Sequence, residues 1–297
     1  MNYVILDLEW NSAYSKRHER FINEIVEIGA VKLNENLEEI DSFKVVVRSC
    51  LTSHLSGRFK RLTNITNEEM QGGVPFAQGL REYTNWVDKS DITMTWSDSD
   101  LYAFLENCRI FAETERIPCI YGYVDLQRFA QNEMKHMDIP VGDNQISLGA
   151  AAELLGIDIS DAQLHRAQGD CRLCGMILRK LYNKEQLIAL VKDTTADDFY
   201  TRLTYKPYFI NDINSPHVDR GEMKFFCPEC EGRVTPNGKW QYKGNAFRRP
   251  FACEKCEHKF IGRVAFKKLY DSVKIKKGTS PFTKPAEGEQ DETNKAD

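Results

Sequence analysis

The chain has 297 residues, a net charge of −4 and 41% hydrophobic residues, which suits one domain of ordinary size beside a smaller one. It contains no run of eighteen apolar residues, so the sequence predicts no membrane span. The beginning, MNYVILDLEW, lacks a basic segment and is interrupted by acids, so we expect no signal peptide. The expectation is a cytoplasmic protein with no membrane partner.

The first part of the chain opens with strand patterns. Residues 3–9 are a short apolar run, residues 25–33 are rich in β-branched side chains, and residues 38–48 form a third such stretch. An Asn-rich turn at 34–36 predicts an antiparallel start. Strand and helix patterns then alternate: helix 67–90, strand 92–96, helix 99–110, strand 117–121, and helices 125–136, 147–155 and 161–182. This order predicts an α/β fold with a mixed sheet flanked by helices on both faces.

The second part of the chain differs in composition and charge. Residues 184–220 predict a helical connector and a linker, residues 221–277 a small module with four cysteines, and residues 278–297 a disordered acidic tail. Residues 232–277 carry a net charge of +10, whereas the residues before them carry −11 and those after them −3. A basic module beside an acidic domain favours separate tasks, with the basic part facing a polyanion.

The four cysteines form two CxxC pairs separated by 22 residues. Paired CxxC motifs in an intracellular chain predict a zinc ribbon, in which Cys227, Cys230, Cys253 and Cys256 hold one structural Zn²⁺. Basic residues alternate with aromatic ones in this module, which suits single-stranded nucleic acid through stacking and phosphate attraction. The aromatic residues are Trp240, Tyr242, Phe247, Phe251 and Phe260. Alternatively, the aromatic residues fill the small core while the cations keep it soluble, or the ribbon docks a protein.

The chemistry of the first part rests on its acidic residues. Asp7 and Glu9 lie two apart in an apolar strand, so both side chains point to one face. Neighbouring buried carboxylates repel each other, so the pair fits either a divalent metal site or a solvated strand edge. The segment TWSDSDLYAFL places further acids at a helix start, where acids also serve as caps. In HRAQGD, His165 and Asp170 stand at the entry to another helix.

Together these pieces follow the order DxE, then D, then HxxxxD, which resembles the DEDDh branch of the DnaQ-like exonuclease superfamily. Supporting segments are VILDLEWN, EIVEIGAVKL, RLTNIT with Asn64 where Gly is usual, and LGAAAELLGI before HRAQGDC. The resemblance covers roughly residues 1–183 and is closest to the enhancer-of-RNAi and histone-mRNA exonucleases. It implies an RNase H-like fold, to which the zinc ribbon is an addition. In that type the middle Asp follows a Trp-containing strand end, which selects Asp100 and leaves Asp98 as the alternative.

The resemblance also implies an activity and a set of residue roles. It implies a 3′→5′ exonuclease that releases nucleoside 5′-monophosphates from single-stranded ends, with RNA favoured over DNA, by means of two Mg²⁺ or Mn²⁺ ions. Asp7 would bridge both ions, Glu9 and Asp170 would support the ion on the nucleophile side, Asp100 the other, and His165 would be the general base.

The same resemblance suggests which residues touch the terminal nucleotide. These are Leu8, Trp10 and Asn11 after the first motif, and Leu62 and Ile65 in the LTNIT element. Core packing is the alternative role for such residues. A DNA proofreading or repair exonuclease, and an inactive nucleic-acid-binding adaptor, remain the alternative functions for the whole chain.

Overall fold

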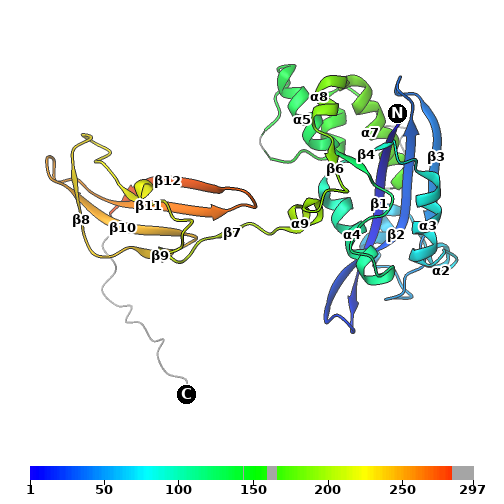
Figure 1. The fold of residues 1–297 in the computed structure, drawn as a ribbon, viewed down its shortest axis with the longest axis horizontal. Helices are drawn as coiled ribbons and strands as arrows, with labels where there is room; N and C mark the ends of the chain where they lie inside the picture. Colours follow the sequence, from blue (N-terminus) through cyan, green and yellow to red (C-terminus); the bar gives the residue numbers. More distant parts are fainter. Residues whose placement is uncertain (143, 159–165, 283–297) are drawn as a thin grey trace. The chain divides into compact units, whose positions relative to one another are not determined.

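The computed structural model describes residues 1–142, 144–158 and 166–282 (Figure 1). The chain divides into two compact units, Met1–Thr204 and Tyr205–Asp297, called unit 1 and unit 2 below. None of the helices in the described part of the chain combines the length and the apolar character that crossing a bilayer requires.

Unit 1 is built on a six-stranded sheet with the order β3-β2-β1-β4-β5-β6. Its strands are β1 Tyr3–Ser15, β2 Arg20–Leu33, β3 Glu39–Val46, β4 Ile92–Thr95, β5 Gly122–Asp125 and β6 Lys192–Asp193. Strands β1, β2 and β3 pair antiparallel, β4 lies parallel to β1 and to β5, and β6 closes the edge antiparallel to β5. The predicted mixed sheet is confirmed, and its arrangement is consistent with an RNase H-like fold.

Helices cover both faces of this sheet, as predicted (Figure 1). They are α1 Gly57–Thr63, α2 Asn67–Gln71, α3 Phe76–Trp86, α4 Asp98–Phe111, α5 Leu126–His136, α6 Leu148–Leu154, α7 Ala167–Leu181, α8 Lys184–Ala189 and α9 Phe199–Thr204. Because side chains alternate along a strand, Val4, Leu6 and Leu8 of β1 pack with α3, α4 and α9. Tyr3 and Ile5 point the other way and pack with α5, α6, α7 and α8.

Several predicted elements of unit 1 have different bounds in the structure. The predicted strand at 117–121 is a loop, and β5 follows it; Ile117 and Ile120 are buried against the core without being in a strand, so their apolar character was misleading. The predicted helix at 67–90 is divided into α2 and α3, because two glycines and Pro75 interrupt it. Strand β1 continues to Ser15 and forms a long hairpin with β2.

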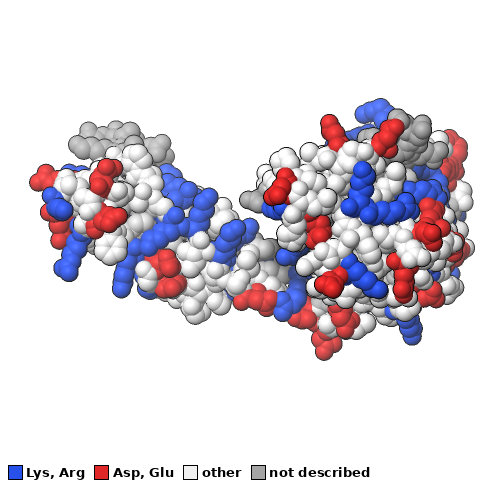
Figure 2. Space-filling model, turned by 90° about the horizontal axis from the view of Figure 1, so that it is seen from above, with Lys and Arg blue, Asp and Glu red and all other residues white. Residues whose placement is uncertain are grey.

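Unit 2 contains a second antiparallel sheet, with the order β12-β11-β10-β8, to which β7 and β9 add pairs with β11 and β10. Its elements are β7 Tyr208–Phe209, the short 3₁₀ helix η1 Gly221–Met223, β8 Val234–Pro236, β9 Gln241–Lys243, β10 Ala246–Cys253, β11 Lys259–Lys268 and β12 Val273–Pro281. Its core is small and contains Phe247, Val264 and Phe266. Lysine and arginine side chains gather on this unit, which lies on the left in Figure 2.

The structure distributes the predicted connector at 184–220 between the two units. Residues up to 204 complete unit 1, since β6 extends its sheet and α9 buries Phe199, Tyr200 and Leu203 in its core. Residues from 205 belong to unit 2, where β7 pairs with β11 and Ile210 is buried. At the other end, β12 continues to Pro281, into the predicted acidic tail; the tail from residue 283 lies outside the described residues.

Candidate active site

A cavity of about 560 Å³ opens beyond the carboxyl end of β4, within the size range of small-ligand sites. Four segments line it, and they are distant from one another in the sequence. The lining residues are Asp7, Leu8, Glu9, Trp10, Trp96, Ser97, Ser99, Asp100, Ser147, Leu148, Gly149, Asp170 and Leu173. The fold therefore brings all four predicted carboxylates, Asp7, Glu9, Asp100 and Asp170, to the wall of one cavity.

Three of these carboxylates are close enough to share a metal ion. Asp7, Glu9 and Asp170 each offer an oxygen, and these atoms lie within 4.8 Å of one another. Asp7 and Glu9 point to the same face of β1 because they are two residues apart. Asp170 joins them from the first turn of α7, which packs on that face.

Asp100 approaches the cluster from the first turn of α4. Its Oδ1 accepts a hydrogen bond from the Leu8 backbone N–H at 3.1 Å, so it lies against β1 beside the other acids. Asp98, the alternative, faces elsewhere: its Oδ1 accepts a hydrogen bond from the Tyr123 hydroxyl at 3.0 Å, and it does not line the cavity. Residues two apart on a helix point in different directions, and this separates the two acids.

The carboxylates repel one another in this arrangement. Burial, reinforced by the negative charges of Asp170, Glu27 and Asp100, raises the pKa of Glu9 to about 8. Burial and the neighbouring acids also raise the pKa of Asp7 well above its usual range, and burial raises the pKa of Asp100 to about 7. A divalent cation would relieve this repulsion, and carboxylate oxygens are the ligands that Mg²⁺ and Mn²⁺ prefer. The donor set therefore fits such ions.

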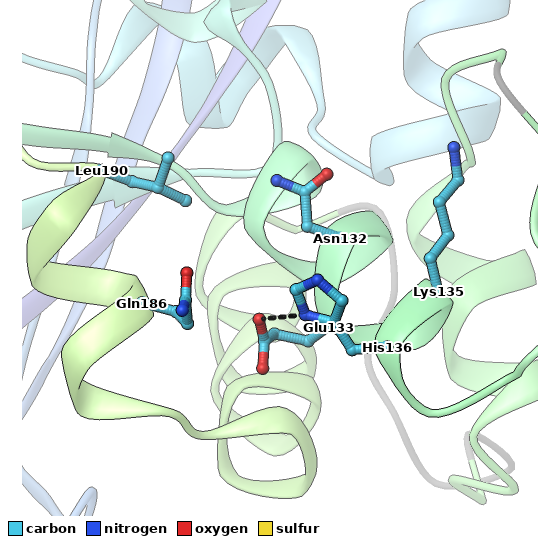
Figure 3. Close-up of a pocket in the computed structure, with 6 residues that line it drawn as sticks. All are labelled: Asn132, Glu133, Lys135, His136, Gln186 and Leu190. Carbon is cyan, nitrogen blue, oxygen red and sulfur yellow. Dashed lines mark hydrogen bonds and ion pairs between the residues drawn. The ribbon is translucent and has the colours of Figure 1, made fainter.

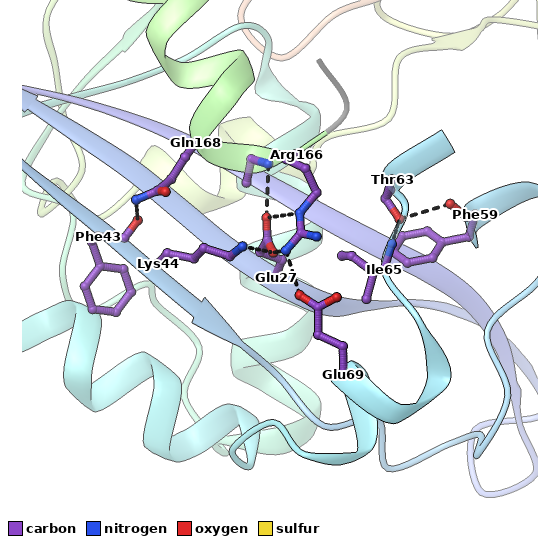
Figure 4. A network of polar contacts seen from close by, with 10 residues as sticks. Glu27, Phe43, Lys44, Phe59, Thr63, Ile65, Glu69, Arg166 and Gln168 are labelled. Atoms are coloured by element: carbon purple, nitrogen blue, oxygen red, sulfur yellow. Dashed lines mark hydrogen bonds and ion pairs between the residues drawn. The ribbon is translucent and has the colours of Figure 1, made fainter. Parts of the chain in front are cut away.

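His165, the predicted general base, lies outside the described residues, but the residue that follows it is firmly held (Figure 4). The Arg166 guanidinium donates hydrogen bonds to Glu27 and, at 2.7 Å, to Glu69. The Ala167 backbone N–H donates to Glu27 Oε1 at 3.2 Å, and the Lys44 ammonium lies 3.3 Å from Glu27 Oε2. A fully buried carboxylate thus anchors the beginning of α7 through the Arg166 guanidinium and a backbone donor, while Lys44 of β3 adds a second positive charge beside it.

Two features of β2 make this anchoring relevant to the cavity. Glu27 lies directly opposite Glu9 in the register of β1 and β2, so the anchor is adjacent to the carboxylate cluster. Gly29 allows α7 to approach β2 closely, since a Cβ at this position would lie 2.5 Å from the Ala167 Cβ. The sequence analysis did not predict this network. Glu27, an acid within the apolar stretch EIVEIGAV, was a signal that could have indicated it.

The five predicted nucleotide contacts fall into two groups. Leu8 and Trp10 line the cavity, and Leu62 is 46% exposed on α1. Asn11 is only 3% exposed, and its Oδ1 accepts a hydrogen bond from the Ser56 N–H at 3.1 Å. Ile65 has no exposed surface and packs in a separate cluster with Phe59 and Met70 (Figure 4). The side chains of Asn11 and Ile65 are therefore engaged within the fold, and that of Leu8, which is also only 3% exposed, packs in the core with α3 and α4. Trp10 and Leu62 offer more side-chain surface.

The backbone conformation explains why asparagine can stand at position 64 of the LTNIT element. Asn64 follows α1 as a cap with φ of 58°, in the left-handed region. Glycine adopts this conformation at least cost and asparagine is the next most tolerant residue, so the exchange of Gly for Asn preserves the turn.

Sequence reasoning missed the remaining cavity walls. Trp96 packs there and donates its indole N–H to the Ile146 carbonyl at 3.1 Å, which links the end of β4 to the segment before α6. Ser147 caps α6 by accepting from the Ala150 N–H at 3.2 Å. A serine before an apolar run was a recognisable capping signal, but its place beside the acids depends on the fold.

A second hollow, of about 330 Å³, lies between α5 and α8 and is lined by Asn132, Glu133, Lys135, His136, Gln186 and Leu190 (Figure 3). Its titratable pair is Glu133 and His136, which lie one turn apart on α5. The distance between Glu133 Oε1 and His136 Nδ1 is 3.2 Å. Glu133 is buried and has the exposed His136 as its partner, so this pair has an ordinary structural role and the acid-lined cavity is the stronger candidate.

The four cysteines of unit 2 form the second candidate metal centre. The Sγ atoms of Cys227 and Cys256, and of Cys230 and Cys253, are each 3.5 Å apart, and all four lie in one cluster. These separations are close to the roughly 3.8 Å expected between thiolates about 2.3 Å from one tetrahedral ion. Gly232 lies against the cluster, where a Cβ would be 3.2 Å from the Cys230 Sγ. Four sulfurs in this arrangement are compatible with a zinc ribbon.

Known proteins bear out the resemblance seen in the sequence. A family model described as Exonuclease (RNase_T) matches residues 4–178. The solved nuclease domain of 3′hExo, a DEDDh family member bound to rAMP, is 22% identical, with a TM-score of 0.53 over 64% of this chain and 96% of that chain. No curated protein matches the sequence.

Two further solved structures show the same fold. A 3′-exonuclease in specific recognition of the 3′ end of a histone mRNA stem-loop is 20% identical, with a TM-score of 0.51 over 64% of this chain and 84% of that chain. A full-length 3′-exonuclease is also 20% identical, with a TM-score of 0.50 over 65% of this chain and 91% of that chain.

Proposed function

Since the chain belongs to the exonuclease (RNase_T) family, we propose that it removes nucleotides from the 3′ end of single-stranded nucleic acid, with RNA preferred over DNA. The observation that carries the proposal is the cluster of Asp7, Glu9 and Asp170, with Asp100 beside it in the same cavity. The RNA preference is supported by the rAMP and the histone mRNA stem-loop named for two proteins of similar fold. The products would be nucleoside 5′-monophosphates.

The cavity would hold two Mg²⁺ or Mn²⁺ ions through its carboxylates. Bound there, the ions would supply water activation and charge stabilisation at the leaving 3′-oxygen. Asp7 would help to hold both ions, Glu9 and Asp170 would hold the ion that activates water, and Asp100 would hold the other. The Leu8 N–H, which donates to Asp100, would fix the orientation of that carboxylate.

His165 is the residue we propose as general base, since a neutral imidazole can take a proton from the attacking water. Glu27 and Arg166 would position it indirectly, because they anchor the residue that follows it in the chain. Trp10 would contact the terminal nucleotide from the cavity wall, beside the small part of Leu8 that borders the cavity, and Leu62 is the exposed candidate from the LTNIT element. In unit 2, the four cysteines would hold one structural Zn²⁺.

Replacement of Asp7 by Asn tests the assignment, with Asp98→Asn as the matched control. Asp98 is also an acid near the cavity, but it faces Tyr123. Loss of a residue that only hydrogen-bonds to a metal ligand typically costs up to about 100-fold in activity. Asp7→Asn replaces a ligand itself, so we expect a larger reduction in mononucleotide release. Asp98→Asn should retain most of the activity.

The substrates are 3′-labelled and 5′-labelled RNA and DNA, single- and double-stranded, with Mg²⁺, with Mn²⁺ or without added metal. Omission of metal is preferable to a chelator, which would also remove zinc. Full activity of Asp7→Asn would contradict the proposal. Faster degradation of DNA would favour a repair-type exonuclease, and binding without any hydrolysis would favour an adaptor.

A further inference from the structure

The sheet of unit 2 has two chemically different faces. Residues directly opposite each other in paired strands share a face, so the registers of β10, β11 and β12 assign each side chain. One face carries Phe247, Phe251, Phe260 and Phe266, all of which are buried. The other face carries six cations, called the basic face here: Arg248, Lys259, Arg263, Lys267, Lys274 and Lys276.

This separation changes the expectation for the aromatic residues. Phe247, Phe251 and Phe260 are buried in unit 2, and the half-buried Trp240 packs against Phe251, so the three phenylalanine rings are not available to stack on bases. Tyr242 is 38% exposed, but it lies opposite Phe247, on the face away from the cations. The cations of the basic face, in contrast, are accessible to a ligand. Lys259, Arg263, Lys274 and Lys276 are exposed, and Arg248 and Lys267 are half-buried. The basic face therefore offers charge, together with Phe209 of β7, which lies opposite Lys267, is 36% exposed and has the Lys267 ammonium 5.5 Å from its ring centroid.

Like charges lie directly opposite each other on the basic face. Arg248 is the cross-strand partner of Arg263, and Lys267 is the partner of Lys274. Such pairs destabilise a sheet, because neighbouring strands are only about 5 Å apart. A surface that merely needed solubility could alternate lysine with glutamate at no such cost.

Neutralising partners are missing from the surrounding strands. Strands β7 to β12 contain no Asp or Glu. Within the described part of the chain, no ion pair involves any of the six cations, whereas Lys277 on the opposite face pairs with Glu222. In Figure 2, blue side chains form a band across the visible side of this unit. Among the described residues of β10, β11 and β12, the registers thus place six cations on the basic face and three, Arg249, Lys268 and Lys277, on the opposite face.

We propose that the basic face binds the phosphate backbone of nucleic acid, independently of base sequence. A polyanion removes the repulsion between the opposed cations, and each neutralised phosphate releases bound counterions. The inference builds on the proposed function, since it assigns unit 2 the task of holding the strand whose end unit 1 degrades. It requires no stacking on Phe247, Phe251, Phe260 or Phe266, which are buried on the opposite face.

The test compares two variants that each lose three positive charges. The first is Arg263→Gln with Lys274→Gln and Lys276→Gln on the basic face. The matched control is Lys224→Gln with Lys239→Gln and Lys255→Gln, three exposed cations of unit 2 outside these strands. Both are made in the full chain with Asp7→Asn, so that a single-stranded oligouridylate is not degraded. Thermal unfolding in zinc-containing buffer verifies that both are folded.

Binding is measured at salt concentrations between about 50 and 200 mM. Loss of three phosphate contacts should reduce the slope of log affinity against log salt by about 2, and should weaken binding at the lowest salt by roughly tenfold or more. The control should retain the slope of the parent. Equal slopes in the two variants would overturn the proposal and leave the basic face to a protein partner.

A separate activity measurement distinguishes this proposal from the one on which it builds. With Asp7 restored, the basic-face variant should release the terminal nucleotide from a trinucleotide at the parent rate but degrade a long strand more slowly. If the parent chain hydrolyses nothing, the proposed function fails, while a difference in salt slope would still support the basic face. If the variant degrades long strands as the parent does, the basic face has no part in holding them.

Discussion

At the scale of single residues, the acid cluster shows how position changes the chemistry of a side chain. Glu9 would be ionised at neutral pH on an exposed strand, but in the cavity its pKa is raised to about 8. Burial raises the pKa of Asp100 to about 7, although the hydrogen bond from the Leu8 N–H lowers it. Without cations the folded protein therefore holds protons at neutral pH that the unfolded chain has released.

The first prediction concerns pH and metal. Because the pKa values of Glu9 and Asp100 are raised in the folded state, their contribution to metal-free stability is complete below about pH 4, the usual carboxylate range, and is lost as pH rises through 7 to 8. A divalent cation competes with these protons, so it binds more tightly at higher pH. We expect Mg²⁺ to raise the melting temperature more at pH 8 than at pH 6.

Calorimetry with and without Mg²⁺ at both pH values measures this effect. Asp7→Asn, which removes one ligand and one charge, should reduce the difference. An equal increase in melting temperature at pH 6 and pH 8 would contradict the coupling between protons and metal at this cluster.

At the scale of elements, the segment after α7 has a structural role that its sequence did not indicate. Strand β6 is only two residues long, yet it closes the edge of the sheet beside β5. Helix α9 packs on the face that also carries α3 and α4, where the Tyr200 hydroxyl accepts a hydrogen bond from the Ile117 N–H at 3.0 Å. Unit 1 is therefore completed by residues that lie beyond its last sequence motif.

The second prediction is that a fragment ending at residue 183 is much less stable than one ending at residue 204. The shorter fragment loses the burial of Phe199, Tyr200 and Leu203, each contributing about 1.5–3 kcal/mol, so the sum is on the order of 5 kcal/mol. That is comparable with the whole stability of many domains. Urea unfolding of the two fragments provides the measurement, and similar midpoints would contradict the role of α9.

At the scale of the whole molecule, the two units differ in what stabilises them. Unit 1 has two large apolar clusters, one on each face of its sheet. In the described part of unit 2, by contrast, one small cluster and the four-cysteine group hold the strands together. A module of this size commonly depends on its metal to fold.

The third prediction follows from this difference. Cys230→Ser should unfold unit 2 and leave the unfolding of unit 1 unchanged, because the remaining three thiolates bind zinc far less well. Cys50→Ser is the matched control, since Cys50 is exposed and lies outside the cluster. Near-ultraviolet circular dichroism and calorimetry distinguish the units. A single shared transition, lowered in Cys230→Ser, would show that unit 1 depends on unit 2.

Prediction from sequence succeeded where spacing along the chain decides the outcome. The alternation that places Asp7 and Glu9 on one face is a property of any strand, and the paired CxxC motifs define a four-sulfur cluster by themselves. It was less successful where apolar residues pack in a loop, as Ile117 and Ile120 do. Hydrophobicity reports burial but not the hydrogen bonding that distinguishes a strand from a covered loop.

The sequence by itself determined the family, the mixed sheet covered by helices, and the residues that form the acid and cysteine clusters, because short motifs and periodic burial encode these locally. The resemblance favoured Asp100 over Asp98, but only the tertiary structure shows that Asp100 faces β1 while Asp98 faces Tyr123, since that depends on which side of α4 faces the sheet. Only the strand registers placed Phe247, Phe251, Phe260 and Phe266 on one face of unit 2 and the six cations of the basic face on the other. In both cases the deciding contacts join segments far apart in the chain, and their pairing follows from how the whole core packs.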